Sequence, residues 1–177
     1  LRKCWVYNLY EESIMFGLGK KSRTAEAIRR GIRASFTGVY LHPSEIESFD
    51  LNKSASSWLY TEALAHHLYV LGYISASALK SDKWATLDFF FESAIDGMKE
   101  AEKNNGPVAD QIAPIILKRY NEFESFTGQE RVEAAHYRSS AELVAKQDST
   151  ANLEEITRAL QTSTDKYVAD ARKMFGI

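Results

Sequence analysis

One stretch, residues 54–79, constrains the fold more than any other part of the 177-residue chain. When it is wound at about 100° per residue, leucine, isoleucine, valine and alanine side chains cover nearly its whole circumference. A helix that is apolar on almost every side is typically the central, buried helix of a domain. Proline is rare, and runs of alternating β-branched residues are few. The sequence therefore predicts an all-α fold: a single bundle of five to six helices around a central helix at about 54–79.

A narrow polar strip interrupts this central helix. Glu62, His66, Tyr69 and Tyr73 follow one another at steps of four, three and four, which places all four side chains in one sector of the helix. The strip is either the one solvated side of a nearly buried helix or a polar site inside the bundle. We treat Tyr69 and Tyr73 as candidates for buried polar side chains.

The remaining helices are predicted from apolar periodicity and from turn residues. A proline inside one of them, Pro114, predicts a kink or a late start of that helix. Ser149 or Thr150 is expected to cap the last helix, with Glu154 and Glu155 in its first turn. The other predicted helices span residues 22–36, 83–103, 107–126 and 129–147.

The N-terminus is expected to stand apart from this bundle. The chain starts at Leu1, whereas Met15 and the residues after it resemble a natural start, so residues 1–14 are interpreted as an upstream extension. The alternative is that they form a short strand or helix that packs on the body. The predicted organisation is an N-terminal extension at 1–21 and one helical domain at 22–177.

Positive charge is concentrated in residues 17–34, although the whole chain has a net charge of −2. Against the single acidic residue Glu26, this segment holds Lys20, Lys21, Arg23, Arg29, Arg30 and Arg33. An amphipathic basic helix could lie on an anionic membrane surface or on nucleic acid, and its composition also resembles that of an organelle transit segment. The alternative is a solvated helix face, and no base-reading motif accompanies the charge.

Two pairs of residues suggest a metal site. Glu62 and His66 lie four apart on one helix face, and Glu133 and His136 form a Glu-x-x-His pair. Carboxylate-bridged di-metal bundles use two such Glu-x-x-His pairs and two further glutamates, so half of the pattern is present here. Iron, manganese or zinc would suit these ligands. The competing interpretation makes His136 a hydrogen-bonded core residue and Glu62–His66 a surface ion pair.

Arg119 falls in the middle of the apolar face of the helix predicted at 107–126. A buried guanidinium needs an acidic partner, and Glu62 or Asp88 is available. Pro114 makes the helical phase uncertain, so the sequence favours the alternative in which Arg119 extends to the solvent.

No complete catalytic constellation is present in the sequence. It lacks the Gly-x-Ser-x-Gly elbow, and Cys4 is its only cysteine. No apolar run approaches the roughly 20 residues of a transmembrane helix, and we expect a cytoplasmic location.

The expected function is contact with another protein or self-association, as a non-catalytic interaction or regulatory protein. Phe89 supports this expectation, because it precedes two further phenylalanines and so points away from the apolar face of its helix. The alternative for Phe89 is that this helix is packed between two layers. The alternative is a metal- or small-ligand-binding bundle that uses Glu62, His66, Glu133 and His136.

Overall fold

The computed structural model describes residues 18–37, 40–79, 90, 93–100, 109–125 and 132–177. All regular secondary structure in these ranges is helical, which confirms the predicted all-α bundle. The helices are α1 (Leu18–Phe36), α2 (Pro43–Glu47), α3 (Lys53–Leu79), α5 (Ala109–Ser125), α6 (Val132–Ala145) and α7 (Leu153–Phe175). Residues 93–100 are also helical, and they are the larger described part of the helix expected at 83–103.

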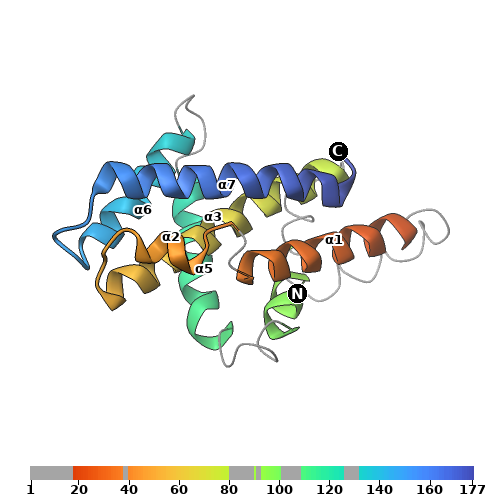
Figure 1. Ribbon diagram of the computed structural model, residues 1–177. Helices are drawn as coiled ribbons and strands as arrows, with labels where there is room; N and C mark the ends of the chain where they lie inside the picture. Colours follow the sequence, from red (N-terminus) through yellow and green to blue (C-terminus); the bar gives the residue numbers. More distant parts are fainter. Residues whose placement is uncertain (1–17, 38–39, 80–89, 91–92, 101–108, 126–131) are drawn as a thin grey trace.

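Helix α3 occupies the centre, as its all-round apolar sequence predicts (Figure 1). Helices α1, α5, α6 and α7 all pack against it, and the long α7 also contacts α1 and α6. No helix among the described residues combines the length and the apolar character needed to cross a membrane.

Two hydrophobic clusters share α3, one along each half of the helix. The first half contributes to a cluster with α2, α6 and α7, which includes Leu41, Ile46, Leu59, Tyr137, Val144, Ile156 and Leu160. The second half contributes to a cluster with α1, α5, residues 93–100 and α7, which includes Ile28, Ile32, Leu68, Leu71, Phe90, Tyr120, Phe123 and Tyr167. Each large apolar side chain buried in this way stabilises the fold by about 1.5–3 kcal/mol.

Asparagines cap the two longest helices. The Asn52 side chain accepts a hydrogen bond from the Ala55 amide at 2.9 Å, and Asn152 accepts from the amides of Glu154 and Glu155. The prediction that Ser149 or Thr150 caps the last helix was therefore wrong. The reason is a turn before the helix, in which the amide and the hydroxyl of Thr150 both donate to the Asp148 carboxylate.

Helix α1 begins at Leu18, four residues before the predicted start. Gly31 lies on its inward side, where an added Cβ would lie 2.8 Å from Leu71 Cδ1 and 2.9 Å from the Tyr167 hydroxyl. A glycine at this position therefore lets α1 approach α3 and α7 more closely than any other residue would.

Candidate functional site

The polar residues of α3 lie in the middle of the helix, where the two hydrophobic clusters meet. Glu62 is 0% exposed, and His66 and the neighbouring His67 are each 2% exposed. The strip is therefore a polar site inside the bundle for most of its length. Tyr69 is buried as well, whereas Tyr73, at the end of the strip, is 40% exposed. We call the buried polar groups at this level the polar layer, which consists of Glu62, His66, His67, Arg119, His136, Ser140 and Ser163.

Arg119 extends into the bundle, not to the solvent as the sequence favoured. It is 4% exposed, and its Nε donates to Glu62 Oε2 at 2.9 Å. Helix α5 continues through Pro114, so Arg119 keeps the phase of the buried residues Ile116 and Phe123. The partner is one of the two acids that the sequence offered; the other, Asp88, lies outside the described residues.

Ser140 on α6 connects the charged pair to His66. Its hydroxyl donates to Glu62 Oε2 and accepts from Arg119 Nη2 at 3.0 Å. Because the single Ser140 hydrogen is used on Glu62, the contact of 2.9 Å with His66 Nε2 requires His66 to be the donor. These bonds join α3, α5 and α6. The sequence signal for Ser140 was its place four residues after His136, on the buried face of α6.

The interior shifts the proton affinity of these groups. Burial raises the pKa of Glu62, while Arg119 and the Ser140 hydroxyl act in the opposite direction. Glu62 Oε1 is buried without a hydrogen-bond partner among the described residues. Burial also lowers the pKa of His66 well below its ordinary value, and His136 adds to this effect. His66 is consequently neutral at physiological pH.

His67 faces a different side of α3, toward α7. Its Nε2 lies 3.0 Å from Ser163 Oγ, and its ring stacks on Tyr167 with 4.5 Å between the ring centroids. Burial lowers the pKa of His67 to about 3. No partner for His67 could be predicted from the sequence. The available signal was that Ser163 lies on the inward stripe of α7, between Leu160 and Tyr167.

The proposed metal ligands are only partly brought together. The ring centroids of His66 and His136 lie 6.4 Å apart. However, His136 Nε2 already donates to the Phe123 carbonyl oxygen, 3.1 Å away. His66 Nε2 and Glu62 Oε2 are bonded to protein groups as well. Among the described side chains, no three acidic, histidine or cysteine groups are placed to hold a metal ion. Glu133 lies in the first turn of α6, and its side chain is outside the described part.

The surface ion pair suggested for Glu62 and His66 is not formed, because both side chains are buried. The core role suggested for His136 agrees with its 3% exposure and its bond to Phe123.

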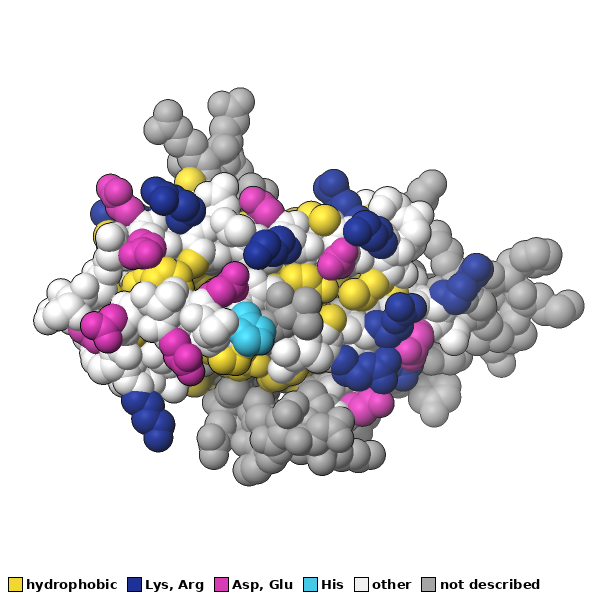
Figure 2. Space-filling model, viewed as in Figure 1, with side chains coloured by type: hydrophobic (Ala, Val, Ile, Leu, Met, Phe, Trp, Pro, Cys, Tyr) yellow, Lys and Arg dark blue, Asp and Glu magenta, His cyan; other side chains and the backbone are white. Residues whose placement is uncertain are grey.

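The arginines of the basic segment lie on the outward face of α1. We call Arg23, Arg29, Arg30 and Arg33 the arginine face. Arg23 and Arg30 are exposed, whereas Arg29 and Arg33 are half-buried. Arg33 bonds to Glu26 at 3.0 Å and to Glu100 at 2.9 Å. Figure 2 shows Lys and Arg side chains gathered at the right of the view, over α1 and the C-terminal part of α7.

Three of the predicted contact residues are not tested by this geometry. The side chains of Lys20 and Lys21, in the first turn of α1, lie outside the described part, and so does Phe89.

Comparison of the chain with protein-family models, with curated proteins and with solved structures gives no match.

Proposed function

We propose that this protein is a non-catalytic interaction protein that binds an acidic surface of another protein through the arginine face of α1. The observation that carries the proposal is that four arginines share one outward helix face with a single acidic residue, Glu26. The inward face of the same helix holds Ile28 and Ile32, both 0% exposed. The fold thus fixes which side of α1 is available to a partner.

The ion pairs on this face support the proposal. Arg33 is held by Glu26 and Glu100, and these three side chains are between 41% and 54% exposed. Exposed ion pairs contribute only about 0–1 kcal/mol, so a partner's carboxylates can replace them at little cost. The same pairs restrict the Arg33 side chain before binding, which lowers the entropy lost in the complex.

The composition of the face favours a protein over a membrane or nucleic acid. Arginine is enriched at protein interfaces, where its planar guanidinium binds carboxylates in a fixed geometry. No base-reading motif accompanies the arginines in the sequence, which counts against nucleic acid. Among the described side chains of α1, the large apolar residue nearest the outward side is Phe36, which is half-buried and packs against the core, so it is not presented to lipid.

The bonds of the polar layer are consistent with a structural role inside the bundle. Its charged pair and its histidines bond to groups on neighbouring helices, and such buried networks can fix how helices align.

Charge reversal on α1 tests the proposal. The Arg23→Glu/Arg30→Glu variant is expected to capture its protein partner at least about tenfold less well at low salt, because rim charges govern association. These two arginines are chosen because they are the exposed members of the face. The measurement is affinity capture from cells that express the chain, followed by mass spectrometry and titration of the captured protein.

The matched control, Lys53→Glu/Arg158→Glu, changes the net charge equally at two exposed positions on α3 and α7. It is expected to keep full capture. Equal loss in both variants would contradict the proposal, and so would binding of anionic vesicles or duplex DNA through the arginine face in place of a protein.

A further inference from the structure

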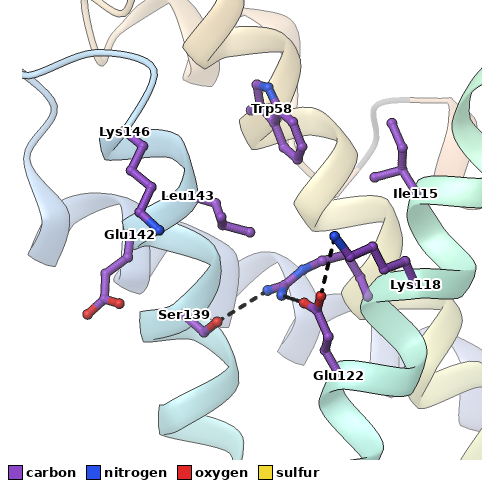
Figure 3. Close-up of a pocket in the computed structure, with 9 residues that line it drawn as sticks. Trp58, Ile115, Lys118, Glu122, Ser139, Glu142, Leu143 and Lys146 are labelled. Atoms are coloured by element: carbon purple, nitrogen blue, oxygen red, sulfur yellow. Dashed lines mark hydrogen bonds and ion pairs between the residues drawn. The ribbon is translucent and has the colours of Figure 1, made fainter.

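A pocket of about 240 Å³ opens between α3, α5 and α6, next to the polar layer (Figure 3). Two sides of this pocket differ in chemistry. Trp58, Leu143 and Ile115 lie on its upper side in the view, and Ser139 and Glu122 lie on its lower side. The complete lining is Trp58, Ile115, Lys118, Arg119, Glu122, Ser139, Glu142, Leu143 and Lys146.

The polar side is built around a buried cation. The Arg119 side chain is 5% exposed, and its Nε is committed to Glu62, whose side chain is 0% exposed. Two pocket groups contact the rest of the guanidinium: Nη1 donates to Glu122, and Nη2 lies 3.5 Å from Ser139 Oγ. Nη2 also donates to the buried Ser140 at 3.0 Å. A guanidinium cannot lose its proton at ordinary pH, so this position is cationic whether or not the pocket is filled.

The two carboxylates on Arg119 are not equivalent. Glu62 is enclosed and shares its Oε2 with Ser140, whereas the Glu122 side chain is 39% exposed. The Glu122 side chain can therefore turn to the solvent, which leaves Arg119 Nη1 free to donate to a ligand. Lys118, which lies 3.9 Å from Glu122, and Lys146 add positive charge at the rim.

We propose that this pocket binds a small monocarboxylate with an apolar body. The ligand carboxylate takes the place of Glu122 on Arg119 and accepts a hydrogen bond from Ser139. The apolar body packs against the Trp58 ring, Leu143 and Ile115. A cavity of about 240 Å³ lies below the ~300–1,000 Å³ of drug-sized sites, so the ligand is small.

Three probes of one shape test the charge requirement. We expect 3-phenylpropionate to bind with a Kd of ~1 mM, the range reached by small fragments. The neutral 3-phenylpropionamide is expected to bind at least about tenfold more weakly, and 3-phenylpropylamine not to bind. Binding is measured on the full chain by ligand-observed NMR titration. Equal affinity for the acid and the amide would overturn the proposal, and so would no saturable binding of the acid below ~10 mM.

Glu122→Gln provides the decisive variant. Removing the competing carboxylate is expected to tighten 3-phenylpropionate binding about three- to tenfold, a change of about 0.7–1.4 kcal/mol. The matched control is Glu142→Gln, because Glu142 also lines the pocket but bonds to Arg138 and not to Arg119. It is expected to change the affinity less than about twofold. Equal tightening by both variants would show a general charge effect and contradict the displacement of Glu122.

Trp58→Leu tests the apolar side. It is expected to weaken binding of 3-phenylpropionate about fivefold or more, because the ring supplies stacking area that leucine lacks. An unchanged affinity would contradict the placement of the apolar body against Trp58.

Discussion

Replacing Arg119 by methionine is expected to lower the free energy of unfolding by about 3–5 kcal/mol. The substitution removes the cation that pairs with Glu62 and leaves a fully buried carboxylate without its counter-charge. It also removes a donor to Ser140. The measurement is equilibrium urea unfolding at pH 7, followed by circular dichroism.

Two further variants separate the loss of a partner from the loss of packing. The Glu62→Leu/Arg119→Met double variant is expected to recover most of the stability, because an apolar pair of similar size leaves no buried charge. Lys118→Met, next to Arg119 but with a side chain 78% exposed, is expected to change stability by less than about 0.5 kcal/mol. A loss below about 1 kcal/mol for the single Arg119→Met variant would contradict the role given to the pair.

Acid is expected to destabilise the protein steeply between pH 7 and pH 5. His66 and His67 have lowered pKa values in the folded state, that of His67 being about 3. The unfolded chain, with histidine pKa values near ~6.5, therefore binds more protons than the folded chain in this range. His67 is expected to remove about 2 kcal/mol at pH 5, and His66 adds to this loss. The raised pKa of Glu62 acts in the opposite direction and offsets part of this loss.

Comparison of urea midpoints at pH 7 and pH 5 measures this effect. His67→Gln removes one titrating group and is expected to reduce the acid-induced loss by about 2 kcal/mol. Gln161→Asn serves as the control, because Gln161 is an exposed residue of α7 that does not titrate, and the loss of this variant on acidification is expected to match that of the unsubstituted protein. Equal losses in the two variants would show that His67 is not held neutral in the folded state.

The central helix could be predicted closely from the sequence, and α3 begins only one residue before the predicted start. The reason is physical: a helix buried on all sides must be apolar on all sides, and few other arrangements accept such a sequence. The start of α1 was harder to predict, because Lys20 and Lys21 lie in a first turn that no apolar pattern marks in the sequence.

The candidate site could also be predicted only in part from the sequence. Periodicity placed Glu62 and His66 together on α3, and it placed Arg119 on the apolar face of α5. It did not provide the contact between the two helices, since that depends on how α3 and α5 pack. Ser140 and Ser163 were missed because a serine inside a helix gives no pattern of its own, and only the polar group that it faces shows its role.

The measurement that tests the central claim most directly is site-specific photocrosslinking in cells. A photoreactive amino acid replaces Arg30 on the arginine face in one variant and Arg158 on α7 in another, both of which are exposed positions. The account predicts one discrete protein adduct at position 30, lost when Arg23 is changed to Glu, and no adduct at position 158. An adduct at position 158 alone, or the same adducts at both positions, would contradict the claim that α1 presents the binding face.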